Sequence, residues 1–455
     1  MSPRVRGDPC EEFGSFFFAT VALGFAVVAF ALVWTNAVDV PYWDEWSWAP
    51  AILKYHAGTL TFADVWAQRN EHRMLFPQLV MLWLDSFGYW SQRRECLFSV
   101  VVVTGSLWLL WRIARCTLPL RPALIVVAIG SSFLFSPAQS ENWLWGYQIA
   151  WFMVDLAVLG AALLLAGPRL SLGVLLAEAA LAMFAAFSSA FGLAILPAVA
   201  FGLFVRRKSF GNAPLLRWIV VSVLIAMTYL WGWHAGGSIK DLGFAIGLAP
   251  RVLHTSIVAG LPLGLAGGTW TSAAFGMLGI ALAAVCVVVV GREEDEGKSA
   301  RAAPWIVMLA YGVVSSAIIG YGRADLGPEQ ALASRYITCS LMLWVGLVGL
   351  GAVRLRWNMP PLSTRIVRGA AVLLALVATV SLFAAWSVGT KDVAAYAVSY
   401  RSMNEVLANY RRASDFDLRT LFPNAGFVRT EISALAGIGQ LPEIRAAKPV
   451  AGRQS

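Results

Sequence analysis

Residues 14–34, "GSFFFATVALGFAVVAFALVW", form a run of 21 residues without a single charged side chain. About 20 apolar residues are enough for a helix to cross the hydrocarbon core of a bilayer, and the apolar core of a signal peptide is shorter. A short basic segment with Arg4 and Arg6 precedes the run. We therefore interpret it as a retained membrane anchor that starts on the cytoplasmic side.

The rest of the chain has the same apolar character. Of its 455 residues, 58% are hydrophobic and 13% are charged, and the mean hydropathy is +0.67. Soluble domains carry roughly 25% charged residues, and tryptophans, of which there are 20 here, concentrate at membrane interfaces. The net charge of +9 is spread over short loops, and the five cysteines form no CxxC pair. This pattern predicts an all-α polytopic membrane protein without a nucleic-acid surface or a disulfide framework.

Hydropathy predicts about eleven transmembrane helices. They lie near residues 14–34, 95–111, 122–136, 148–166, 171–187, 190–205, 216–233, 270–290, 304–321, 333–353 and 367–387. Two further apolar runs, 74–90 and 252–269, contain prolines and glycines, and we place them at the outer surface because the inner loops then hold the excess of Arg and Lys. The prediction is a transmembrane domain over 1–390, with a first outer loop at 36–94, and a small extracytoplasmic tail at 391–455.

The first outer loop is expected to contain interfacial helices. "DEWSWAPAILKYHAG" (44–58) has the spacing of an amphipathic helix that would turn Trp43, Trp46 and Ile52 toward lipid. "TFADVWAQ" (61–68) predicts a second short helix, and 74–90 a third that lies deeper.

Two adjacent acids, Asp44 and Glu45, stand among tryptophans in "YWDEWSWAP" (42–50). One interpretation is the water-facing side of an interfacial helix. The other is a general base, because a carboxylate hemmed in by indoles loses water and its pKa rises. Both interpretations remain open at this point, as does the choice between the two acids.

Three further segments place polar side chains at the predicted outer surface. In "QRNEHRMLFP" (68–77), Asn70, His72 and Arg73 would either cap a helix and anchor it at the interface or bind an anion at the helix N-terminus. In "ENWLWGYQ" (141–148), Glu141 and Gln148 among aromatic rings suit a sugar, although an aromatic belt would also explain the rings.

The third segment is "ASRY" (333–336), at the start of a predicted span. An arginine opposes the dipole of a helix N-terminus, so Arg335, next to Tyr336, is interpreted as recruited by an anion, with snorkelling as the alternative. Asp155, inside a predicted span, is either functional or a buried hydrogen-bonded acid. No Walker loop or HExxH pattern suggests a nucleotide or metal site.

The order of these segments resembles that of GT-C glycosyltransferases, membrane enzymes that use sugars carried on polyprenyl phosphate. The resemblance rests on "YWDEW", "NEHRMLFPQLVMLWLDSFGYWSQRRECLFSV", "ENWLWGYQIAWF" and "ASRY", and covers roughly residues 10–390. It implies a catalytic base in the first outer loop, which is Asp44 with Glu45 beside it, and a second acid, Glu141. It also implies that Arg73 and Arg335, with His72, hold the lipid phosphate, and that Asn70, Gln148 and Tyr336 contact substrate.

The resemblance further implies sugar transfer, with inversion, to a cell-envelope glycan or lipid acceptor at the extracytoplasmic face of a bacterial plasma membrane. The donor would be a polyprenyl-phosphate-linked hexose or pentose, and the scheme requires no cofactor or metal. The alternative is a transporter or flippase for a lipid-linked saccharide, which would have paired halves, broken helices and buried ions near the middle of the membrane.

Overall fold

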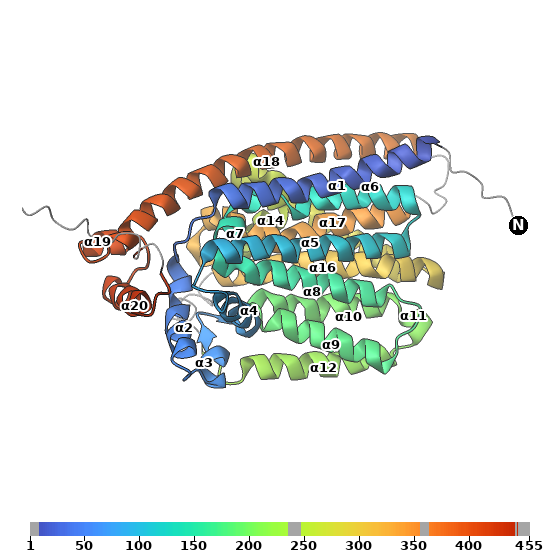
Figure 1. The fold of residues 1–455 in the computed structure, drawn as a ribbon. Coiled ribbons are helices and arrows are strands. Elements are labelled where there is room, and N and C mark those ends of the chain that lie inside the picture. Colours follow the sequence, from blue (N-terminus) through green and yellow to red (C-terminus); the bar gives the residue numbers. More distant parts are fainter. Residues whose placement is uncertain (1–8, 235–246, 355–363, 442–443, 445–455) are drawn as a thin grey trace, which may run out of the picture.

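The computed structural model describes residues 9–234, 247–354, 364–441 and 444. Its long helices lie side by side in one bundle, with shorter helices collected at one end (Figure 1). In chain order the long helices are α1 (Pro9–Asn36), α5 (Gln92–Thr117), α6 (Leu120–Leu134), α8 (Ile149–Leu165), α9 (Leu172–Ala186), α10 (Ile195–Val205), α12 (Ala213–Leu230), α14 (Leu248–Gly264), α15 (Gly268–Gly291), α16 (Glu296–Arg323), α17 (Ile337–Arg354) and α18 (Thr364–Ala408).

Shorter elements connect these helices. The short α-helices are α2 (Ala49–His56), α3 (Phe62–Trp66), α4 (Leu75–Asp85), α7 (Ser140–Leu144), α11 (Arg207–Phe210), α19 (Asp415–Leu418) and α20 (Ala425–Gly437). The 3₁₀ turns are η1 (Trp43–Trp48), η2 (Pro137–Gln139), η3 (Gly146–Gln148), η4 (Ala190–Ala194), η5 (Leu265–Gly267), η6 (Ala324–Leu326), η7 (Pro328–Leu332) and η8 (Ser334–Tyr336). Two strands, β1 (Gln68–Arg69) and β2 (His72–Arg73), form a hairpin.

Eight helical segments of the described chain are long and apolar enough to cross a membrane, which confirms an all-α polytopic class. They are Phe16–Asn36, Gln92–Thr117, Leu120–Leu144, Gly146–Leu165, Ala213–Leu230, Leu248–Gly291, Glu296–Leu326 and Ser334–Arg354. By length and hydropathy, the described chain therefore has fewer spanning segments than the eleven predicted transmembrane helices. Helices α9 and α10 form where spans were expected but are shorter than the usual spanning length.

The centre of the bundle is built from α8, α16 and α17, whose apolar windows are mostly buried, whereas α1 and α12 expose most of theirs. Small residues allow the central helices to approach closely. A side chain at Gly349 would collide with the Trp305 ring, and one at Gly260 would collide with the backbone of Ser272 in the α14–α15 hairpin. Close helix contact through glycine is usual where lipid surrounds the protein.

The end of the bundle that holds the site is covered by residues 37–91 and 409–441, which we call the cap (left in Figure 1). Helix α18 continues from the bundle to the cap, so the boundary expected near residue 390 falls inside one helix. The tail then packs on the first loop, because Trp43 N donates to Leu421 O (2.8 Å) and Trp90 N donates to the Gln440 side chain (2.8 Å).

The structure corrects the expected orientation of the first loop. Trp46 and Ile52, predicted to face lipid, are 0% and 1% exposed, whereas Trp43 is 43% exposed. Trp46 is buried because its ring packs edge-on against Trp90 (5.9 Å between centroids) and the cap covers it. Helix α4 has 11 residues and a length of about 16 Å, too short for a core of about 30 Å, which fits its expected place at the surface.

Candidate active site

Residues 68–73, expected to cap a helix, form a two-stranded hairpin, and the expected helix, α4, begins just after it at Leu75. Gln68 pairs with Arg73 and Arg69 pairs with His72, across a turn in which Asn70 has φ +48°. Tight hairpin turns require positive φ, which asparagine tolerates better than most residues. Because directly paired side chains point to the same face of a hairpin, Gln68 and Arg73 share one face and Arg69 and His72 share the other.

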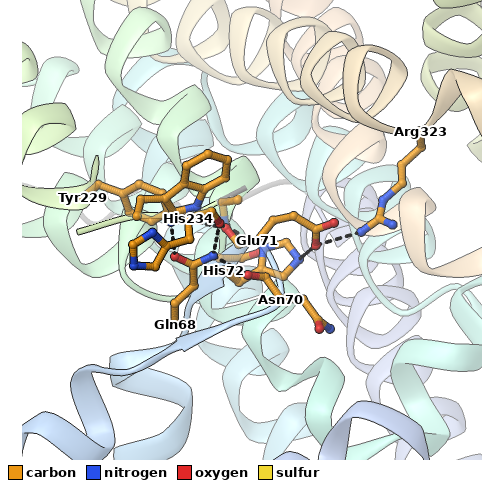
Figure 2. Close-up of polar contacts among 10 residues, drawn as sticks. Gln68, Asn70, Glu71, His72, Tyr229, His234 and Arg323 are labelled. Carbon is orange, nitrogen blue, oxygen red and sulfur yellow. Dashed lines mark hydrogen bonds and ion pairs between the residues drawn. The ribbon is translucent and has the colours of Figure 1, made fainter. Parts of the chain in front are cut away.

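The Gln68–Arg73 face fixes the hairpin to the end of α12. Arg73 is 4% exposed, and its guanidinium donates to the carbonyls of Trp66 (3.2 Å), Tyr229 (2.7 Å) and Trp231. Gln68 exchanges two hydrogen bonds with the backbone of His234 (2.6 and 2.9 Å; Figure 2). Carbonyls at a helix C-terminus need such donors. Arg73, expected to bind phosphate, is therefore occupied by backbone carbonyls.

The opposite face presents His72 beside Glu71. His72 Nδ1 accepts a hydrogen bond from Ala190 N (3.1 Å), so the neutral ring carries its proton on Nε2, 4.0 Å from Glu71 Oε2. Burial lowers the pKa of His72; Glu71 and Asp44 oppose this shift, and Arg323 adds to it. Glu71 Oε2 also accepts from Arg323 Nη2 (3.1 Å), as Figure 2 shows.

Arg69, on the same face as His72, was not singled out by the sequence. It is half-buried, its Nε has no hydrogen-bond partner, and no residue in the described ranges forms an ion pair with it. Burial lowers the pKa of Arg69, and Tyr147 and Asp64 oppose the shift. The buried hydroxyl of Tyr147 also lacks a partner and lies in the field of Asp44 and Arg69. The register set by the two-residue turn separates Arg69 from Arg73, because simple alternation would place residues four apart on the same face.

Asp44 belongs to the same polar group and follows a strained residue. Trp43 has φ +48°, and in the described part of the chain it and Asn70 are the only residues other than glycine with positive φ. Such backbone strain collects at functional sites. Asp44 is half-buried and interacts electrostatically with His72 and Tyr147. Glu45 points inward instead, is fully buried, and burial raises its pKa. The geometry thus separates two acids that the sequence left equivalent.

A second charged group contains Glu141 and Arg335, which form an ion pair (2.9 Å). Glu141 Oε2 also accepts from Arg335 N (3.1 Å) and the Ser334 hydroxyl (3.2 Å). The anion that attracts Arg335 in this structure is therefore the predicted second acid. Tyr42 connects this pair with the first group: burial raises the pKa of Tyr42, Glu141 and Asp44 add to the shift, and Arg335 opposes it.

The remaining predicted residues lie at the edges of this region. Asn70 is exposed at the hairpin tip, and its carbonyl accepts from the Gln68 amide (2.5 Å). Gln148 and Tyr336 are buried, and the Tyr336 ring packs near Trp151 (5.9 Å). No group of three or more His, Cys, Asp and Glu side chains in the described ranges is arranged to hold a metal ion.

An apolar groove of about 410 Å³ lies between α5, α8 and α9. Its lining residues are Gly105, Trp108, Leu109, Leu156, Ala157, Gly160, Leu181 and Phe184. The Phe184 ring packs on Phe76 of α4 (4.9 Å), and Ser189, just beyond α9, lies 3.3 Å from His72 Nδ1. One end of the groove therefore approaches the Arg69–His72 face.

Comparison with known proteins returned no match: no family model, curated protein or solved structure is similar to this chain. Any functional assignment must therefore come from the site itself. The site combines one half-buried acid, one arginine without an ion pair among the described residues, a neutral histidine and a neighbouring apolar groove.

Proposed function

We propose that this chain is a membrane glycosyltransferase that moves a sugar from a polyprenyl-phosphate donor to a cell-envelope glycan or lipid acceptor. The observation that carries the proposal is the hairpin at the end of an apolar bundle. Its free face sets His72 in the field of Asp44, and it sets Arg69 beside Tyr147, on which Asp44 also acts. The strained backbone at Trp43 and Asn70 supports a functional role for both segments.

The donor needs two environments that adjoin here. Its isoprenoid tail requires an apolar surface, which the groove between α5, α8 and α9 offers. Its phosphodiester requires donors at headgroup depth, and Arg69, whose Nε has no hydrogen-bond partner among the described residues, supplies them together with the Nε2–H of His72. Arginine suits phosphate because its planar fork donates two parallel hydrogen bonds.

Asp44 is the proposed base. It accepts the proton of the acceptor hydroxyl while that oxygen attacks the anomeric carbon, and the bond from this carbon to the phosphate oxygen breaks, with inversion. The leaving lipid phosphate gains negative charge, so Arg69 stabilises the transition state more than the ground state. Glu141, Arg335 and Tyr42 line the side from which the acceptor would enter. The scheme needs no metal or other cofactor.

The proposed location is a bacterial plasma membrane with the cap outside the cytoplasm. Basic residues cluster at the bundle end opposite the cap, for example Arg112 and Arg115 in the last turns of α5 and Arg206 to Lys208 at α11. Helix α11 lies at that end in Figure 1. An excess of Arg and Lys marks the cytoplasmic side, so this distribution supports an extracytoplasmic site.

The decisive experiment replaces Asp44 in cells and in purified protein. Vesicles with the purified protein receive a polyprenyl-phosphate [¹⁴C]hexose or [¹⁴C]pentose and an envelope extract as acceptor. Asp44→Asn should abolish label transfer, whereas Asp415→Asn, which alters a cap acid that pairs with Arg429, should retain it. Both variants should insert at wild-type levels. Wild-type transfer by Asp44→Asn would refute the mechanism.

A lipid-saccharide transporter is the second candidate, because two acids are buried inside the bundle. Asp155 lies in α8 beside the Tyr311 hydroxyl, and the Glu178 carboxyl in α9 has no hydrogen-bond partner. Buried ionisable groups are common on the ion pathways of transporters. In proteoliposomes with a fluorescent lipid-linked saccharide, a transporter would lose translocation on Asp155→Asn and keep it on Asp44→Asn. The glycosyltransferase proposal predicts no translocation in any of these proteins.

A further inference from the structure

Behind Asp44 lies a second pair of acids that the proposed reaction does not use. Glu45, in η1, and Glu95, in the first turn of α5, are 0% and 2% exposed, and their carboxyl groups lie close enough to interact directly. Two carboxylates this close cannot both stay ionised in a buried place unless a positive charge neutralises them.

No Lys, Arg or His in the described chain forms an ion pair with either acid. The titratable groups around it are Asp39 from the loop after α1, Asp44 from η1, Cys96 from α5 and Tyr147 from η3. None of them can become a cation. Neutral donors complete the surroundings: Trp90 Nε1 donates to Glu95 Oε1 (3.1 Å), and Tyr42 N donates to Glu45 Oε2 (3.3 Å).

The remaining polar atoms of the cluster converge. Among the described residues, the buried Glu45 Oε1 and Glu95 Oε2 find no donor with hydrogen-bond geometry, and the Gln92 amide lies close to Glu45. A side chain at Gly146 would collide with both the Glu95 carboxyl and the Gln92 amide oxygen. Buried polar atoms are costly when unpaired, so a proton held between the two carboxyls is the simplest way to satisfy them.

We infer that Glu45 and Glu95 share one proton and that this pair positions Asp44. Asp44 immediately precedes Glu45, and Trp43 on its other side is held in its strained conformation by Leu421 O. The shared proton therefore ties η1 to α5 at the residue next to the proposed base. Loss of the shared proton leaves two adjacent carboxylate anions. Their repulsion moves η1 away from α5 and displaces Asp44. Only the consequence for Asp44 rests on the proposed function.

Infrared spectroscopy tests the shared proton without reference to sugar transfer. In purified full-length protein, a protonated carboxyl gives a carbonyl stretch above the amide band that shifts in D₂O. We expect a band that disappears on titration to alkaline pH and is lost in both Glu45→Gln and Glu95→Gln. Glu178→Gln, which changes a buried acid outside the pair, should leave that titrating band in place.

Two infrared results would overturn the inference. One is a titrating band that survives in either single variant, because the proton would then belong to one acid alone. The other combines two observations. Wild-type protein lacks the band at neutral pH, and elemental analysis finds one equivalent of bound cation that Glu45→Gln no longer binds. A cation, rather than a proton, would then hold the acids together.

The pH profile of transfer tests the effect on Asp44. Wild-type transfer should fall at alkaline pH as the shared proton leaves. Glu45→Gln should transfer at neutral pH and keep its rate at alkaline pH, because an amide still donates to Glu95 and the pair keeps one negative charge. Glu45→Ala should be slow at every pH. An alkaline decline that persists in Glu45→Gln would exclude positioning by this pair. If no protein, wild type included, transfers sugar while the infrared results are as expected, the proposed function is refuted and the shared proton stands.

Discussion

Arg69 and Arg73 stand four residues apart on the same hairpin and have opposite surroundings. The Arg73 guanidinium is enclosed and donates to three carbonyls, whereas Arg69 is half-buried with an unpartnered Nε and no ion pair among the described residues. A buried cation whose donors are all engaged stabilises the fold, and one whose donors remain available can bind a ligand. Position in a polar segment therefore says less about function than the partners a side chain already has.

Removing Arg73 should have the largest effect on stability. Arg73→Ala leaves the carbonyls of Trp66, Tyr229 and Trp231 without this donor, which should cost about 3 kcal/mol of unfolding free energy. The measurement is the midpoint of thermal unfolding in detergent. Arg69→Ala is the matched control and should unfold within about 0.5 kcal/mol of wild type. Equal losses in the two variants would abolish the distinction between the two faces.

Removing Arg69 should have the largest effect on activity at unchanged stability. Arg69→Ala should slow sugar transfer about 100-fold, because a fixed donor to the leaving phosphate is lost. Arg69→Lys should recover only part of the rate, since an ammonium cannot donate in the same bidentate way. The measurement is the initial rate as a function of donor concentration in vesicles. A wild-type rate in Arg69→Ala would move the phosphate site elsewhere.

The turn that separates the two faces should respond to backbone strain. Asn70→Ala should destabilise the protein by about 1 kcal/mol, because alanine tolerates φ +48° poorly. Asn70→Gly should be close to neutral, since glycine adopts this conformation without a steric cost. Thermal unfolding in detergent measures both. A neutral alanine variant would show that the turn relaxes and that positive φ is not enforced there.

His72 should produce a smaller, pH-dependent effect on the ligand-binding face. Burial lowers the pKa of His72 in the folded protein, so the unfolded chain binds a proton first as the pH falls below about 6.5. Stability should therefore decline on acidification below that pH, and His72→Gln should make the decline shallower. Thermal unfolding between neutral and mildly acidic pH measures the difference. A steeper decline in His72→Gln would contradict a neutral, buried ring.

Hydropathy was sufficient for the membrane class, because crossing a bilayer depends on the local property of an uninterrupted apolar run. It also predicted short helices in the first loop, where α2, α3 and α4 form. The prediction that Trp46 and Ile52 face lipid was wrong. Periodicity shows that side chains share one face of a helix, but it does not show what packs against that face. Here the cover includes Trp90 and the tail, which follows hundreds of residues later in the chain.

The hairpin shows a second limit. Strands of two residues are too short to have a periodicity, and Asn70-Glu71 is a weaker turn signal than Asn-Gly. The segment was therefore expected to be a helix N-terminus, and Arg73 stood out while Arg69 did not. In contrast, the dipole argument for Arg335 required an anion, and the structure supplies Glu141 as that anion.

By itself, then, the sequence determined that this is a helical protein of the membrane, with its acids and arginines concentrated in a few connecting segments. Only the tertiary structure decided which of those groups are already satisfied: Arg73 by carbonyls and Arg335 by Glu141. The physical reason is that burial and hydrogen-bond partners come from residues distant in the chain. Local composition cannot report them.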